Sequence, residues 1–241
     1  MRHRIGEPDK LKSPKKRSDS FASSLNGEQM SVPSGIADMF RKKILKGELT
    51  SGNRIIESRW CKELRVGQPS VREALLLLES QGLVQRIPNL GTFVTELSIK
   101  DVSNLYQIRG ELEGLAAELA ARKAQKEDIA ELRQLIENMK SDLSKHGTWG
   151  YFKNDLIFHE RIWVLSGNQH LAALLEKIVV PLLAFSFMRV ERDRDELIQS
   201  IDLHTPIVDA IAAADPKNAR QVLQHTVRVF LDRDLSVIFQ Q

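Results

Sequence analysis

The sequence predicts a mainly α-helical protein with an N-terminal winged helix-turn-helix domain and a C-terminal all-α helical bundle. Three observations predict this fold. Residues 33–95 show three short helical patterns followed by two β-like pieces, residues 98–241 show almost uninterrupted helical patterns, and the charge changes sign between the two parts. Residues 1–97 hold 17 Lys and Arg against 11 Asp and Glu, a net charge of +6, whereas residues 98–241 hold 18 against 21, a net charge of −3. A polyanionic partner is therefore expected at the N-terminal part.

Length and composition restrict the class of protein. The chain has 241 residues, 42% apolar and 28% charged, which is typical of one large or two small soluble domains that each bury a core. The longest apolar run, residues 178–187, is shorter than the roughly 18 residues of a membrane span. The N-terminus has no secretory segment, and the single cysteine, Cys61, suits a reducing compartment. These features predict a cytoplasmic protein without a membrane partner.

The N-terminal part divides into a tail and a winged domain. Residues 1–30 combine Lys and Arg with Ser, Pro and Gly, which predicts a disordered basic tail. In the winged domain, residues 31–97, three helices are expected before Gly82. The third is expected to begin at Ser70, with Glu73 placed for a capping box. It is predicted to bury four apolar side chains: Val71, Ala74, Leu75 and Leu78.

A hairpin and then a helical bundle are expected to follow. Two β-like pieces, residues 83–87 and 92–95, flank a turn and predict the wing. The C-terminal domain, residues 98–241, is expected to be all α. Its helices are predicted at about residues 99–125, 127–145, 148–165, 168–191, 195–214 and 216–239.

Five residues of the winged domain are candidates for DNA contact. Arg72 lies in the first turn of the third predicted helix, where its guanidinium would reach a phosphate or a guanine edge in the major groove. Gln68 and Ser70 precede it and offer hydrogen bonds, and Asn89 and Gly91 lie at the tip of the hairpin. The alternative for Arg72 is a surface arginine that pairs with a nearby acid. Periodicity alone leaves the two alternatives open.

A resemblance to the GntR family of bacterial winged-helix transcription regulators, in its FadR-like branch, covers about residues 33–235. It rests on the segments ILKGELTSGNRIIE, VGQPSVREALLLLESQGLVQRIPNLGTFV, DVSNLYQIRGELEGLAAELAA, DLIFHERI, SGN and DLHTPIVDAIAAAD. The VREAL segment is typical of the DNA-binding half. The Arg-x-x-Leu-Glu and Asp-x-x-x-His patterns are typical of the helical effector domain, the FCD type. The resemblance departs at residues 67–70, where Gln68 stands in place of the usual arginine.

Four residues of the helical part form a candidate metal site. Asp155 and His159 are four residues apart on one predicted helix, and His204 and His225 lie among apolar residues of two others. One carboxylate and three imidazoles suit Zn²⁺ first, and also Ni²⁺ or Mn²⁺. The alternative for each histidine is a buried side chain with a hydrogen-bond partner. The resemblance favours metal, because many family members bind a divalent ion through an aspartate and three histidines. His170 is expected at the surface.

Arg109 is the other charged residue on an apolar stripe. A buried arginine needs a carboxylate partner, and an internal pair with Glu113 is one interpretation. The resemblance implies another, in which Arg109 lines an effector cavity and binds a small carboxylate.

Together these features predict a DNA-binding transcription regulator, acting as a repressor, and not an enzyme. Its helical domain would bind a divalent metal and a small organic acid that changes operator affinity. A homodimer is expected, because helix-turn-helix readers pair on palindromic operator sites. Two alternatives are a mononuclear metallohydrolase, for which no general base stands at a motif spacing, and a regulator for which the ion itself is the signal.

Overall fold

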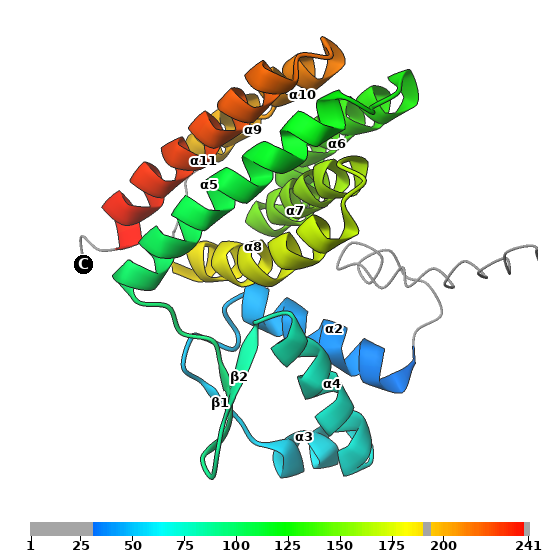
Figure 1. Ribbon diagram of the computed structural model, residues 1–241. Helices are drawn as coiled ribbons and strands as arrows, with labels where there is room; N and C mark the ends of the chain where they lie inside the picture. The colour runs from blue at the N-terminus through cyan, green and yellow to red at the C-terminus, as the bar shows by residue number, and fades with distance from the viewer. Residues whose placement is uncertain (1–30, 190–193, 239–241) are drawn as a thin grey trace, which may run out of the picture.

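The computed structural model describes residues 31–189 and 194–238 and confirms the mainly α-helical fold (Figure 1). The predicted tail, residues 1–30, lies outside the described residues. In Figure 1 the winged domain occupies the lower half of the molecule and the helical domain the upper half, with α8 (Gln169–Arg189) along the junction.

The winged domain contains the three predicted helices and a small sheet. The helices are α2 (Val32–Leu45), α3 (Glu57–Leu64) and α4 (Gln68–Ser80). The hairpin of β2 (Val84–Ile87) and β3 (Gly91–Val94) is antiparallel, with Gln85 opposite Phe93. The sequence analysis missed β1 (Arg54–Ile55), which pairs with the other edge of β3, because two residues carry no readable alternation.

The core of the winged domain forms where the periodicity predicts it. The four predicted apolar side chains of α4, Val71, Ala74, Leu75 and Leu78, are at most 1% exposed. Phe40 of α2 meets Trp60 of α3 edge to face, with ring centroids 4.8 Å apart. Cys61 is half-buried beside this cluster.

The predicted Ser70 cap is wrong. Helix α4 begins at Gln68, and its N-cap is Gly67, whose backbone is extended. Proline is tolerated in the first helical turn, where its missing N–H costs no hydrogen bond, so Pro69 does not delay the start. Ser70 is therefore the third residue of the helix, and Arg72 lies one turn further along than a Ser70 cap implies.

The helical domain contains one more helix than predicted within residues 98–189 and 194–238. Its helices besides α8 are α5 (Ile99–Ala121), α6 (Lys126–His146), α7 (Thr148–Leu165), α9 (Arg194–Asp202), α10 (Thr205–Ala212) and α11 (Pro216–Ile238). The segment predicted as one helix over residues 195–214 is two helices, α9 and α10. Helix α10 starts afresh at His204, its N-cap, with Pro206 in its first turn.

Helix α5 lies at the centre of the helical domain. It packs along α11 and also against α7 and α8 (Figure 1). A methyl group on Gly114 would lie 2.8 Å from Cγ of Gln224, so this glycine permits the close approach of α11. The fully buried face of α5 carries Val102, Tyr106, Arg109 and Glu113, whereas the leucines on a neighbouring face of the same helix are half-buried.

Helix α8 joins the two domains. A methyl group on Gly82, after α4, would lie 2.9 Å from Cγ of Pro181 in α8, and α2 also packs on α8. Residues Gln169–Phe187 are long and apolar enough to cross a membrane by length and composition alone, with a mean hydropathy of 1.7. This stretch is longer than the run noted in the sequence. Half of it is buried inside the protein, which is typical of a core helix.

Candidate DNA-binding face and buried site

The candidate DNA-binding residues lie on α4 and on the hairpin, at the lower end of the molecule in Figure 1. Arg72, Gln68 and Asn89 are exposed, and Ser70 and Gly91 are partly buried. The backbone of Asn89 has φ 64° and that of Gly91 has φ 114°, so both adopt left-handed conformations that close the turn. A methyl group on Gly91 would lie 3.3 Å from Nε of Arg54.

Arg72 forms the pair with a nearby acid that the alternative interpretation expected, and its side chain is exposed. Its side chain is 58% exposed, and Nε donates a hydrogen bond to Oε2 of Glu57 at 2.8 Å. Gln68 Nε2 donates to the same oxygen at 3.1 Å. Burial raises the pKa of the Glu57 carboxyl, but the hydrogen bonds from Arg72 and Gln68 lower it more, so the net shift is downward. Glu57 therefore holds both predicted contact residues in place as an ionised acceptor.

Sequence reasoning missed Glu57 and Arg86. Glu57 is the first residue of α3 and lies 15 positions before Arg72, so only the crossing of α3 and α4 brings them together. Arg86, exposed on β2, is close enough to lower the pKa of Glu57 by its charge. The available signal for Arg86 was its position on the predicted wing, because an arginine on a hairpin next to α4 is well placed to contact a DNA phosphate.

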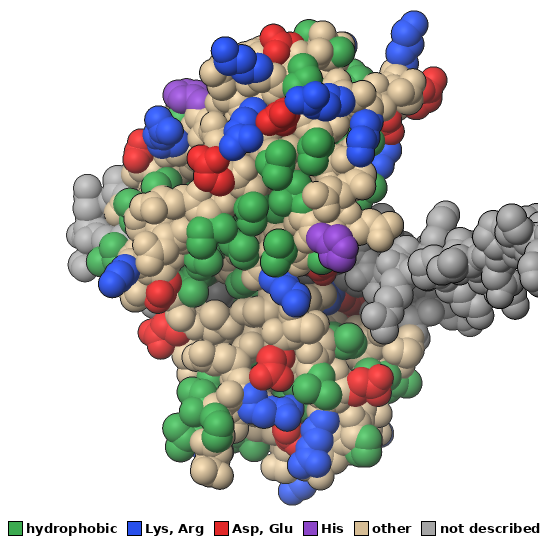
Figure 2. Space-filling model, viewed as in Figure 1, with side chains coloured by type: hydrophobic (Ala, Val, Ile, Leu, Met, Phe, Trp, Pro, Cys, Tyr) green, Lys and Arg blue, Asp and Glu red, His purple; other side chains and the backbone are tan. Residues whose placement is uncertain are grey.

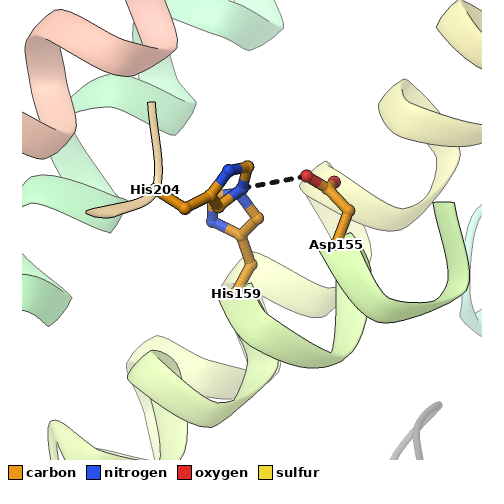
Figure 3. Close-up of side chains that lie close together, drawn as sticks. All are labelled: Asp155, His159 and His204. Atoms are coloured by element: carbon orange, nitrogen blue, oxygen red, sulfur yellow. Dashed lines mark ion pairs between the residues drawn. The ribbon is translucent and has the colours of Figure 1, made fainter. Parts of the chain in front are cut away.

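The buried candidate site is formed by three of the four predicted metal ligands (Figure 3). Asp155 and His159 project from α7, and His204 projects from the junction of α9 and α10. Their ligand atoms lie within 4.8 Å of one another, and each residue is at most 4% exposed. Nε2 of His204 lies 3.0 Å from Oδ1 of Asp155.

His225 is not part of this group. It is exposed on α11, whereas the next residue, Thr226, is 2% exposed. The buried stripe of α11 consists of Ala219, Leu223, Val227 and Phe230 together with Thr226. Val222 and Val229, which are among the apolar residues around His225 in the sequence, are only half-buried. The structure also places His170 at the surface, as expected.

The hydrogen bonds of His204 leave one ring nitrogen available inside the protein. Nδ1 lies 2.9 Å from the carbonyl oxygen of Ser200 and 3.2 Å from that of Ile201, so Nδ1 carries the proton and donates. Nε2 is buried, makes no hydrogen bond, and faces the carboxylate of Asp155. Nε2 of His204 and Oδ1 of Asp155 are therefore two acceptors only 3.0 Å apart. Such a pair requires a cation between the two atoms or a second proton on His204. The donor set therefore fits a divalent metal ion, with a backbone acceptor orienting the ligand.

A second layer of contacts surrounds His159. Nε of Arg109 donates to Oε2 of Glu113 at 2.7 Å, and Nη2 of Arg109 lies 3.3 Å from Nε2 of His159, to which it donates. Glu113 Oε1 lies 2.8 Å from Nδ1 of His159 and accepts a hydrogen bond from Trp163 at 2.8 Å. The predicted internal pair of Arg109 and Glu113 is thus present. The NH1 group of Arg109 is buried without a hydrogen-bond partner.

The carboxylates of the site stay ionised. Burial raises the pKa of Glu113, but the charges of Arg109 and His159 bring it down to about 2. Burial also raises the pKa of Asp155, yet the contact with His204 and the charges of His159 and Arg109 hold that pKa well below its usual range. Burial lowers the pKa of Arg109, but Glu113 raises it more, so the guanidinium keeps its charge. An ionised Asp155 is suited to bind a metal cation, and a charged Arg109 is suited to bind an anion.

These features define a class of protein. A winged helix-turn-helix with an exposed face on α4 is joined to an all-α domain that contains a buried carboxylate–histidine group, which is the two-domain architecture of a transcription regulator. The family model "Bacterial regulatory proteins, gntR family" matches residues 34–94, and the FCD domain model matches residues 104–228. The chain belongs to the GntR family and carries an FCD domain, and it is not an enzyme.

Relatives and solved structures agree with this membership. The probable D-xylose utilization operon transcriptional repressor of Paenarthrobacter nicotinovorans is 30% identical over 83% of this chain and 87% of its own length. The regulator YdhC of Bacillus subtilis is 34% identical over 58% of this chain and 63% of its own length. The structure of Escherichia coli McbR/YncC has a TM-score of 0.74 at 23% identity, covering 86% of this chain and 99% of that one, which shows a shared fold.

Proposed function

We propose that this protein is a cytoplasmic, ligand-responsive repressor that binds operator DNA through α4 and the hairpin and binds a divalent metal ion and a small organic acid in its helical domain. The observation that carries the proposal is the buried group of Asp155, His159 and His204. It lies in the same chain as the winged domain, whose helix α4 has an exposed face. A regulator needs both a reading surface and a buried site that senses a ligand.

Three protein ligands suit a divalent ion that keeps open coordination positions, and zinc is the first candidate before nickel or manganese. When bound, the ion supplies positive charge and those positions to an anionic ligand. Arg109 would bind the carboxylate of the acid, because its buried NH1 group has no other hydrogen-bond partner. Oδ1 of Asp155 also accepts a hydrogen bond from the hydroxyl of Tyr151 at 3.1 Å, which holds the carboxylate in place.

We infer that the protein acts as a homodimer. Apolar side chains gather across the helical half in Figure 2, and the outer side of α5 carries Leu105, Leu112 and Leu115, half-buried, with Ile108 46% exposed. A second copy would cover such a stripe and would present two reading helices to a palindromic operator. Sedimentation at micromolar concentration tests this part of the proposal, and a monomer would contradict it.

The DNA-binding part is tested by Arg72→Ala. Bound sequences are first selected from a random duplex pool with the wild-type protein, and the best sequence is used in mobility-shift titrations. The variant should lose about 1–3 kcal/mol of binding if Arg72 contacts a base edge with two hydrogen bonds. A loss that is equal on all sequences, with a smaller salt dependence, would indicate a phosphate contact.

The control is Arg133→Ala on α6, which removes another exposed, ion-paired arginine from the helical domain. Its operator affinity should equal that of the wild-type protein. If Arg72→Ala also binds like the wild type, Arg72 does not contact DNA.

A further inference from the structure

One carboxylate oxygen of α3 holds two exposed side chains of α4. Oε2 of Glu57 accepts a hydrogen bond from Nε of Arg72 at 2.8 Å and another from Nε2 of Gln68 at 3.1 Å. The side chain of Glu57 is 24% exposed and that of Arg72 is 58% exposed, so the acid is the more covered of the two. A shared acceptor fixes its two donors relative to each other, because both must point at the same oxygen.

The contact with Glu57 determines which way the amide of Gln68 points. An ionised carboxylate only accepts hydrogen bonds, so the amide nitrogen, and not the amide oxygen, must be the atom next to Glu57. The second hydrogen of Nε2 and the oxygen Oε1 then remain available. Neither group hydrogen-bonds to another residue within residues 31–189 and 194–238, and Gln68 is exposed at the start of α4. Gln68 therefore presents one donor and one acceptor in a fixed order.

This pair of groups matches the edge of one base. In the major groove adenine presents an acceptor, N7, next to a donor, the N6 amino group, and a glutamine amide contacts both at once. Guanine presents two neighbouring acceptors, N7 and O6, so one of them would meet the acceptor Oε1 of Gln68. An unpaired acceptor in a desolvated interface is costly, so the arrangement of Gln68 favours adenine over guanine.

The same carboxylate leaves the outer end of Arg72 available for guanine. Because Nε is bound to Glu57, the groups Nη1 and Nη2 remain, and neither hydrogen-bonds to a residue in the described part of the chain. Two parallel N–H groups of an arginine fit O6 and N7 of guanine. Gln68 and Arg72 are one turn apart, about 6 Å along the helix axis, and base pairs are stacked about 3.4 Å apart. Their two bases should therefore lie within about two base pairs of each other.

We propose that Gln68 reads an adenine of the operator, close to the guanine read by Arg72, and that Glu57 is the positioning residue that fixes both side chains for this task. Glu57 itself acts through Gln68 and Arg72 and does not contact a base. The inference rests on the proposed function, because it specifies bases of the operator that α4 binds.

The adenine contact is tested on the operator selected from the random duplex pool, with full-length protein in mobility-shift titrations. Replacing the adenine by another base should weaken wild-type binding at least about fivefold. Two analogues that still pair with thymine, 7-deazaadenine without the N7 acceptor and 2-aminopurine without the N6 amino group, should each weaken it at least about threefold. Gln68→Ala should be insensitive to both analogues, and Gln68→Arg should select guanine at this position, because arginine pairs with guanine.

The positioning role is tested by Glu57→Ala. Its discrimination against other bases at the adenine and at the guanine should each fall at least about fivefold. It should bind a random duplex at least as tightly as the wild type, because the change removes a negative charge near the DNA. A purely structural role would instead weaken binding to all sequences alike. Glu63→Ala is the matched control, since Glu63 is another acid of α3, paired with Arg59 at 3.9 Å, and it should keep both base preferences.

The remaining outcomes separate the inference from the proposed function. A selected operator without such an adenine, or an adenine preference that persists in Gln68→Ala, overturns the role of Gln68 and leaves an operator-binding regulator standing. Base preferences that are unchanged in Glu57→Ala overturn the positioning role. If the wild-type protein selects no sequence from the pool, the proposed operator binding fails, and this inference fails with it.

Discussion

Glu113 is the residue on which the buried site depends most. It is 0% exposed and accepts hydrogen bonds from Arg109 and Trp163 while its Oε1 lies against His159. Glu113→Gln keeps the shape but removes the charge, so Arg109 becomes a buried cation without a counter-ion. We expect a loss of about 3–5 kcal/mol in the free energy of unfolding, measured by urea titration.

The matched control for Glu113 is on the same helix. Glu118→Gln alters an acid at the protein surface that pairs with Arg122 and Arg220, and the stability should change little because solvent screens such pairs. Equal losses in the two variants would mean that the buried pair contributes no more than a surface pair.

The metal ligands make a second prediction at the residue scale. Protein incubated with Zn²⁺ and then desalted should retain about one ion per chain by elemental analysis. Asp155→Ala, His159→Ala and His204→Ala should each reduce this retention strongly, because three ligands leave no replacement. His225→Ala should retain zinc like the wild type, since that side chain faces solvent. Loss of zinc in His225→Ala would restore the four-ligand site expected from the sequence.

At the scale of elements, the junction between α2 and α8 contains buried charges. Arg41 of α2 is 3% exposed, forms an ion pair with Asp38, and donates to Gln81 at 3.0 Å. Burial lowers the pKa of Arg41 to about 10, although Glu176 of α8 and Glu160 of α7 raise it by their charges. Acids on α7 and α8 of the helical domain therefore act by their charge on a buried arginine of the winged domain.

Glu176 gives this junction a pH dependence. Burial raises the pKa of its carboxyl above 4.5, although Arg41 and Lys177 lower it. The folded protein therefore prefers protonated Glu176, and stability falls as pH rises from 4.5 through the raised pKa. Glu176→Gln removes this cost, so its melting temperature should exceed that of the wild type at pH 7 and equal it near pH 4.

The exposed Glu137→Gln on α6 serves as the control for Glu176 and should melt like the wild type at both pH values. If Glu176→Gln melts below the wild type at pH 7, the attraction of Arg41 outweighs burial and the sign assigned here is wrong.

At the scale of the whole molecule, two connections join the surroundings of the buried site to the winged domain. Helix α7 carries His159 next to Glu160, whose charge acts on Arg41 of the winged domain. Helix α5 carries Arg109, and four residues separate its start from the end of β3. A ligand that shifts α5 or α7 would therefore alter the position of the winged domain.

Linkage gives a quantitative expectation for this coupling. A coupling of about 1–3 kcal/mol changes operator affinity roughly 5- to 150-fold, and the operator must change effector affinity by the same factor. Titration of zinc-loaded protein with a panel of small organic acids, with and without the selected operator, measures this factor from the effector side. Acid binding that is unaffected by operator would show that the helical domain binds the acid without controlling DNA.

The sequence by itself determined the fold class and most helices, because apolar spacing and turn residues report local structure directly. The buried face of α4 and the hairpin at residues 88–91 follow from such local signals. It also determined three residues of the buried site. Asp155 and His159 are one helical turn apart on a helix whose inward face is apolar, and His204 lies among apolar residues of another segment.

Only the tertiary structure decided which of two apolar stripes on a helix is buried. Helices α5 and α11 each carry two such stripes, and packing within the helical domain buries Arg109 and Thr226 while it leaves Ile108 and His225 exposed. Contacts between distant residues, such as that of Glu57 with Arg72, depend on helix crossings that no local pattern encodes. Periodicity describes one helix at a time, whereas burial is a property of the helices packed together.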